Sequence, residues 1–183
     1  MFFYLYAKEH GWRNAVYYWL TELKKSSFFR RLFCLVFFVM LMLMRTLLNR
    51  NMWANPLSDI MGGWTLYDEN GELTTEAIEN VMLMLPYTAL LMWVLKCKTL
   101  KKITIRSAMW HGMKFALFTS ITIEFLQLLL RLGTLQLSDI FYNTVGGILG
   151  GLTYYICYKV KYRYTEHVKK NSYKGDSYDE ENN

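Results

Sequence analysis

Five polar residues with helical spacing lie between positions 124 and 143. Glu124, Gln127 and Arg131 stand at i, i+3 and i+7, so one helix would place them on a shared face. Asp139 and Asn143 stand at i and i+4 and would share a face of the next helix. Carboxylates beside a guanidinium and amides can form ion pairs, transfer protons or hold an anionic group such as a phosphate. Which chemistry applies depends on the elements that position these side chains.

Those elements are long apolar runs, which predict an all-α membrane protein. Of the 183 residues, 53% are hydrophobic, a larger share than most soluble proteins have. A spanning helix needs about 20 mostly apolar residues. Four segments meet this requirement and together predict a membrane domain over 28–158: 28–48, 78–95, 107–130 and 138–158. Pro86 lies inside the second segment and predicts a kink there.

The two ends of the chain differ from this membrane domain. Residues 1–27 mix aromatic and basic side chains, which fits either a helix lying on the membrane surface or a flexible, partly ordered segment. Residues 159–183 are polar and end in an acidic run, so we expect a disordered cytoplasmic tail.

Positive charge predicts the orientation of the four spans. Residues 1–31, the loop after the second span and the tail carry six, five and six Lys/Arg residues. The loops after the first and third spans carry only Arg50 and Arg131, respectively. Because Lys and Arg concentrate on the cytoplasmic side, both termini are expected inside the cell. The net charge of +6 then reflects the membrane face, and we expect no nucleic-acid partner.

This topology brings polar groups of all four spans to one depth near the outer surface. Arg45 ends the first span, and Glu79 and Asn80 begin the second at the same level. Charges in the hydrocarbon are costly, so we expect Glu124 and Asp139 to pair with Arg131 or Arg45. The predicted polar cluster comprises Arg45, Asn80, Glu124, Gln127, Arg131, Asp139 and Asn143.

A stripe of glycines in the fourth span could bring these groups together. Two overlapping G-x-x-x-G patterns run from Gly146 to Gly150 and from Gly147 to Gly151. Small residues at this spacing let helices approach closely. Close approach would set Asp139 and Asn143 beside the Glu124 face. Such a network could bind a ligand, or it could only cross-link the helices.

The remaining chemistry-bearing residues show no site pattern. Cys34, Cys97 and Cys157 form no C-x-x-C pair and read as reduced packing residues. The three histidines are widely spread. We expect no metal site and no cofactor.

The sequence from Ile123 to Gly151 resembles the VanZ-like family of bacterial membrane proteins. That family shows E-x-x-Q, a basic residue, D-x-x-x-N and a glycine pair. The corresponding residues here are Glu124, Gln127, Arg131, Asp139, Asn143, Gly146 and Gly147. Arg45, the Asn55-Pro56 pair, Asn80 and Pro86 resemble further family positions, whereas Tyr87-Thr88 stands where many members have a glycine. The resemblance covers about 32–158. It implies an association with resistance to teicoplanin, a glycopeptide antibiotic that acts at the cell wall, without revealing a mechanism.

Three functions fit these observations. The first is a protein that binds or modulates a cell-envelope ligand at the outer face of the cell membrane: a lipid-linked precursor, a lipid headgroup or a lipoglycopeptide. The second is an intramembrane enzyme acting on a lipid phosphate, with Glu124 or Asp139 as general acid or base. The third is an accessory subunit that pairs with itself or with a membrane partner through the glycine stripe. Membrane lipids are expected contacts in all three.

Overall fold

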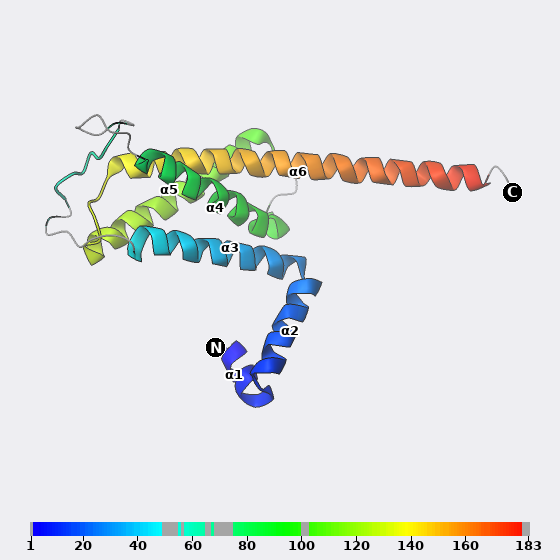
Figure 1. Ribbon diagram of the computed structural model, residues 1–183. Coiled ribbons are helices and arrows are strands. Elements are labelled where there is room, and N and C mark those ends of the chain that lie inside the picture. Colours follow the sequence, from blue (N-terminus) through cyan, green and yellow to red (C-terminus); the bar gives the residue numbers. More distant parts are fainter. Residues whose placement is uncertain are drawn as a thin grey trace.

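The computed structural model describes residues 2–48, 55, 57–64, 67, 75–99 and 103–180, and within them the chain is helical with no strand. In Figure 1 the long helices form a bundle, and the shorter N-terminal helices project from it. The elements are α1 (Phe2–His10), α2 (Trp12–Lys25), α3 (Ser27–Leu43), η1 (Met44–Leu48), α4 (Glu76–Thr99), α5 (Ile105–Leu130) and α6 (Leu137–Glu180). The predicted all-α fold is therefore confirmed.

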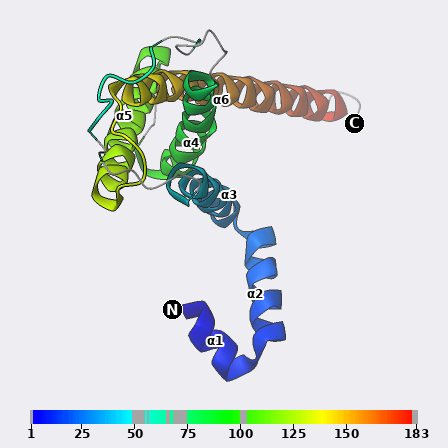
Figure 2. The ribbon, with the colours of Figure 1, turned by 60° about the vertical axis from the view of Figure 1, so that its left-hand side comes forward.

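The N-terminal segment forms two helices. Gly11, with a φ of 83°, separates α1 from α2, and Ser26 separates α2 from α3. The Ser26 side chain accepts a hydrogen bond from the N–H of Phe29, which caps α3. In Figure 2 this helix pair stands clear of the bundle. The described part of the segment is thus helical, and its position on the membrane surface stays a prediction.

Among the described residues, three helices are long and apolar enough to cross a membrane: Ser27–Leu47, Glu76–Leu95 and Ile105–Leu130. They correspond to the first three predicted spans. Pro86 lies within α4, which continues as one helix through it. The α6 helix does not reach the same hydropathy, because Asp139, Asn143 and several tyrosines and glycines dilute its apolar residues. The fourth span therefore stays a prediction.

The α6 helix is also longer than the sequence analysis expected. It continues beyond residue 158 to Glu180, into the segment predicted to be disordered. The chain has no proline after Pro86, and a lone Gly175 costs a helix only about 1 kcal/mol relative to alanine. Nothing in this stretch therefore acts as a strong helix stop. The prediction of a disordered tail was based on its polar composition and did not consider that the helix could continue.

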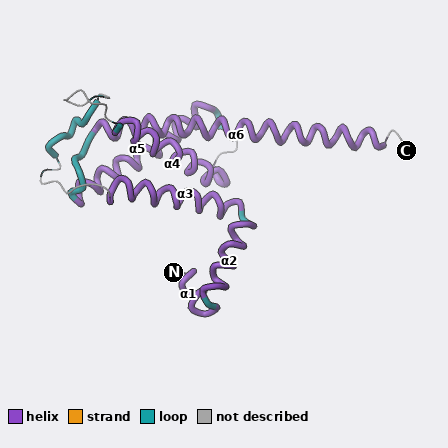
Figure 3. Tube along the Cα trace, viewed as in Figure 1, coloured by secondary structure: helices purple, strands orange, loops and turns teal. Residues whose placement is uncertain are grey.

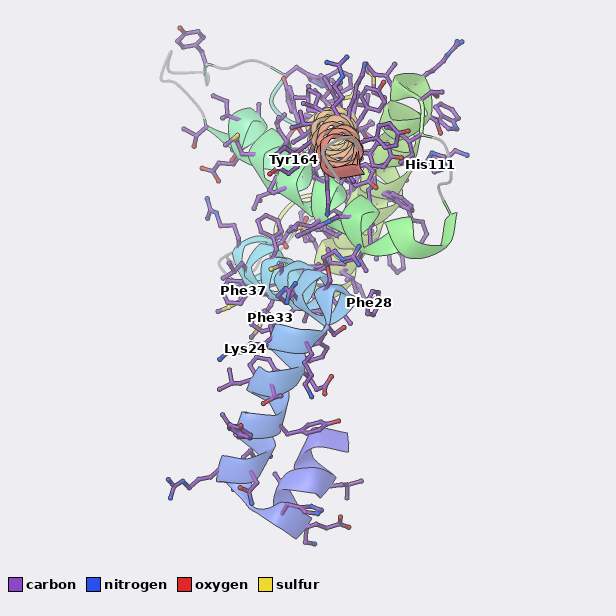
Figure 4. All side chains as sticks on the ribbon, turned by 90° about the vertical axis from the view of Figure 1, so that its right-hand side faces the viewer. Lys24, Phe28, Phe33, Phe37, His111 and Tyr164 are labelled. Atoms are coloured by element: carbon purple, nitrogen blue, oxygen red, sulfur yellow. The ribbon has the colours of Figure 1, made fainter. Side chains whose placement is uncertain are left out.

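The helices pack around α6. Long stretches of α6 contact both α4 and α5, whereas α4 and α5 touch each other little and α3 packs mainly on α4. In Figure 4, which looks along α6, α3 lies on the side of the bundle opposite α6. Phe28, Phe33 and Phe37 of α3 remain exposed, with Phe37 55% accessible, as expected for side chains that face lipid.

Two stripes of glycine fit α6 against its neighbours. A Cβ on Gly146 would come within 2.6 Å of the Val81 carbonyl oxygen in α4, and one on Gly150 would overlap Thr88. On the adjacent stripe, a Cβ on Gly147 would lie 2.7 Å from the Gly112 carbonyl oxygen in α5. Gly151 in turn packs on Ala108. Each G-x-x-x-G pattern therefore faces one helix, and α6 lies close to its neighbour on both sides.

The connections at one end of the bundle pack on each other. Figure 3 shows loop segments gathered where α5 ends and α6 begins. The backbone N–H of Leu137 donates to the Ile60 carbonyl over 2.9 Å, and Gln136 Nε2 donates to Asp59 Oδ2 over the same distance. Tyr142 Oη donates to the Trp64 carbonyl over 3.0 Å. The segment 57–64 therefore covers the start of α6 at this end.

Candidate functional site

The polar cluster lies at the end of the bundle where these loops meet. α3 and η1 end there, α4 begins there, α5 ends there and α6 begins there. The alternating direction of the helices thus brings one polar stretch from each of them to a common level. This juxtaposition is the one that the sequence predicted.

A buried link joins α4 to α6. Asn80 Nδ2 donates to Asp139 Oδ1 over 2.7 Å, and Asp139 is only 5% exposed. A buried carboxylate is tolerated when donors satisfy its oxygens, and this amide is one of them. The packing of Gly146 on Val81, one residue along α4, makes the short reach possible.

A second link joins α6 to α5. Asn143 Nδ2 donates to Ser120 Oγ over 2.9 Å, and both side chains are buried. Ser120 lies one helical turn before Glu124 on the same face of α5. The Asp139/Asn143 face is therefore set beside the Glu124/Gln127 face, as the glycine stripe led us to expect.

Glu124 connects the cluster to the loop that follows α5. Its Oε2 accepts the backbone N–H of Gln136 over 3.1 Å, and the residue is 3% exposed. Gln136 also holds Asp59 of the covering segment. The Glu124 carboxylate thus helps to hold the loop between α5 and α6, which covers the cluster at this end of the bundle.

Gln127 reaches the last turn of the first span. Its Nε2 donates to the Thr46 carbonyl over 2.8 Å, where a helix end leaves carbonyls without an intrahelical donor. Its Oε1 is buried and has no hydrogen-bond partner within the described chain, and the residue is 1% exposed. A buried acceptor without a partner is unusual and calls for a physical explanation.

A small cavity lies among these side chains, with a volume of about 10 Å³. Its polar lining comes from Thr46, Asn80, Glu124, Gln127, Asp139 and Asn143, and its apolar lining from Met42, Leu83, Met84 and Ile123. This space suits a single water-sized species. A phosphate or a lipid headgroup is far larger, so the inside of the cluster is not an anion site in this conformation.

Arg45 lies at the edge of the cluster and pairs with Glu79. Its Nη2 contacts Glu79 Oε2, and the two side chains are 49% and 40% exposed. Thr75 Oγ1 donates to the other Glu79 oxygen over 2.8 Å. Arg45 occupies a π-helical turn, a geometry that recurs at functional sites. The expected pairing of Arg45 with Glu124 or Asp139 is wrong, because Glu79 at the start of α4 takes its guanidinium.

Arg131 is not part of the cluster either. It ends α5 in the left-handed conformation, with φ 55° and ψ 37°, and its side chain is exposed. Within the described chain it forms no ion pair. The prediction that Arg131 shares a helix face with Glu124 required the helix to continue through position 131. The chain leaves the helix there, so the shared face ends at Gln127. The predicted pairs of Arg131 with Glu124 and Asp139 are therefore wrong.

Some partners in this network were missing from the predicted cluster. Glu79 was placed at the right level but left out, although Arg45 one span away offered a cationic partner. Ser120 and Thr46 gave little signal, because hydroxyl residues are common in membrane helices and Thr46 contributes only its backbone carbonyl. No group of three or more His, Cys, Asp or Glu that could hold a metal ion occurs among the described residues.

Comparison with known protein families gives a match over most of the chain. A family model described as VanZ/LLP1 matches residues 2–158. No curated protein and no solved structure matches the chain. The match ends where the fourth span was predicted to end, and it includes α1 and α2, which lay outside the resemblance read from the motifs. These findings, with three helices able to cross a membrane, make this a membrane protein in contact with lipid. The chain belongs to the VanZ-like family.

Proposed function

We propose that the protein crosses the cell membrane four times, over about 28–48, 78–95, 107–130 and 138–158, with both termini in the cytoplasm. Residues 1–27 lie on the cytoplasmic face of this membrane domain, and 159–183 form a cytoplasmic tail. The loop end of the bundle then lies at the outer surface. There the protein binds or modulates an envelope ligand: a lipid-linked wall precursor, a lipid headgroup or a lipoglycopeptide of the teicoplanin type.

The observation that carries this proposal is the polar network shared by four helices at one end of the bundle. Glu124, Gln127, Asp139 and Asn143 are all buried there. Charged and polar groups are expensive inside a membrane and by default mark a functional region. The half-exposed Arg45–Glu79 pair lies at the edge of this network and supplies groups that an external ligand could reach.

The enzyme alternative has less support from the geometry. Glu124 and Asp139 line a cavity of about 10 Å³, which does not admit a substrate headgroup. The arginines that would stabilise phosphate charge lie outside that cavity. A binding or modulating role requires only the accessible rim and a rigid interior. The glycine-stripe partner expected for an accessory subunit is also less favoured, because α4 and α5 already cover both stripes.

The proposal is tested by antibiotic susceptibility in a Gram-positive host. The cells would carry empty vector, wild type, Glu124→Gln, Arg45→Gln or the control Glu76→Gln, with membrane abundance measured for each. Glu76 is an exposed carboxylate at the start of α4, outside the cluster.

We expect wild type and Glu76→Gln to raise the teicoplanin concentration needed to stop growth. Glu124→Gln and Arg45→Gln should lose this protection at equal abundance. Absence of protection by wild type would remove glycopeptides from the proposal. Full protection by equally abundant Glu124→Gln and Arg45→Gln would contradict a functional cluster.

A further inference from the structure

The cavity beside Gln127 has a polar lining that is short of hydrogen-bond donors. Gln127 Nε2 is directed at the Thr46 carbonyl, which can only accept. The nitrogen and oxygen of this amide cannot exchange places, because two carbonyl oxygens would then face each other. Gln127 Oε1 is therefore an acceptor without a partner, in a residue 1% exposed that lines the cavity.

The other amides of the lining also direct their nitrogens to protein partners. Asn80 Nδ2 donates to Asp139, and Asn143 Nδ2 donates to Ser120 Oγ. The lining also contains the carboxylates of Glu124 and Asp139 and, among the described residues, no Lys, Arg or His. Each carboxylate has a hydrogen-bond partner of its own in Gln136 or Asn80. Each of the three amide nitrogens also has a second N–H, but the lining still holds more side-chain oxygens than N–H groups, and two of its groups are carboxylates.

The species that best fits this lining is small, positively charged and bound by oxygen. A water molecule prefers both donors and acceptors around it, and it leaves the charge of the carboxylates unchanged. Hard cations take carboxylate and amide oxygens as ligands, and membrane proteins bind Na⁺ with such oxygens near broken helix ends. Transition metals prefer His and Cys, which this lining lacks.

We propose that the cavity enclosed by α4, α5, α6 and the end of the first span binds one alkali-metal cation of the size of Na⁺. Gln127 Oε1 and the carboxylates of Glu124 and Asp139 are its ligands. The cation fixes the four helix ends to one another beneath the covering segment 57–64. This site is independent of any envelope ligand, so it stands or falls separately from the proposed function.

The test is the thermal unfolding of the purified full-length protein in detergent, followed by tryptophan fluorescence. The salt is NaCl or choline chloride at equal ionic strength, because choline is too large for the cavity. A ligand that binds only the folded state raises its stability with concentration. We expect the unfolding temperature to rise by about 5 °C at a roughly hundredfold excess of Na⁺ over its Kd, and not with choline.

Two variants assign the effect to the cavity. Asp139→Asn keeps an oxygen for Asn80 but removes one negative charge from the lining, and it should abolish most of the Na⁺-dependent rise. Glu79→Gln removes a carboxylate outside the cavity and should keep the full rise. Direct binding of ²²Na⁺ to wild type and Glu79→Gln provides a second readout if Asp139→Asn does not fold.

Equal unfolding temperatures in NaCl and choline chloride, with no saturable ²²Na⁺ binding, would overturn the proposal and leave the cavity to water. A full Na⁺ response in Asp139→Asn, or its loss in Glu79→Gln, would also overturn it, because the site would then lie elsewhere.

Discussion

At the scale of single residues, the cluster is a set of amide–carboxylate hydrogen bonds rather than a set of ion pairs. Both arginines that the spacing placed in it are elsewhere: Arg45 pairs with Glu79, and Arg131 caps α5. The buried carboxylates are instead served by Asn80 and by the Gln136 backbone N–H. Neutral donors avoid burying further charge, and that suits a network inside a membrane domain.

Removal of one amide should therefore be costly. Asn80→Ala takes the donor from the buried Asp139 carboxylate, and leaving such a group unsatisfied costs about 1–3 kcal/mol. We expect a lower unfolding temperature in detergent than for wild type. Asn14→Ala is the matched control, because Asn14 Nδ2 donates to the His10 carbonyl at an exposed site. Equal effects of the two substitutions would mean that burial of the Asp139 link contributes nothing.

Arg131 offers the opposite expectation. The left-handed conformation costs a residue other than glycine about 1–2 kcal/mol of folding stability, and glycine at position 131 would avoid this cost. Part of that gain is lost because glycine also has more conformational freedom in the unfolded chain. Arg131→Gly should therefore unfold at the same temperature as wild type or higher. A clear loss of stability in the same assay, absent from Arg131→Lys, would show that a long, positively charged side chain stabilises the fold at this position.

At the scale of elements, α6 sets the geometry of the cluster. Its two glycine stripes hold α4 on one side and α5 on the other, and Asp139 and Asn143 continue these faces toward the loop end. The spacing of four between glycines was visible in the sequence. A partner for one stripe was visible too, because the small residues Ala108, Gly112 and Ala116 repeat every four positions in α5. The partner of the other stripe was not, because Val81 in α4 belongs to no such pattern.

A methyl group on a glycine of the stripe should separate the helices. Gly147→Ala places a Cβ 2.7 Å from the Gly112 carbonyl oxygen and against Ala116, and overpacking of this kind costs about 1–3 kcal/mol. We expect a lower unfolding temperature. Gly63→Ala is the control, since a Cβ there meets nothing within 4 Å. If both variants unfold like wild type, the α5–α6 approach is looser than described.

The sequence predicted elements better than their ends. Three of the predicted spans coincide within a few residues with described helices that are long and apolar enough to cross a membrane, because a run of apolar side chains is a strong signal. The departure of the chain from the helix at Arg131 and the continuation of α6 to Glu180 were missed. Helix ends depend on local capping and on tertiary contacts, such as the hydrogen bond from Leu137 to Ile60, and these leave little trace in sequence periodicity.

At the scale of the whole molecule, alternating helices bring polar residues far apart in sequence to one end. Thr46 and Gln127 are 81 positions apart and share a hydrogen bond. The charge bias of the loops, with basic segments at the opposite end of the bundle, predicts that the polar end faces the outside of the cell. Only with this orientation could an envelope ligand reach the Arg45–Glu79 pair at the edge of the cluster.

The most direct test of this placement is the labelling of single cysteines in intact cells with a membrane-impermeant maleimide. The background would replace Cys34, Cys97 and Cys157, and the probes would be Ser58→Cys in the covering segment and Thr165→Cys in α6, both at exposed positions. We predict labelling of Ser58→Cys from outside, and of Thr165→Cys only after the membrane is permeabilised. Labelling of both from the same side would contradict four spans, and the reversed pattern would place the polar cluster in the cytoplasm.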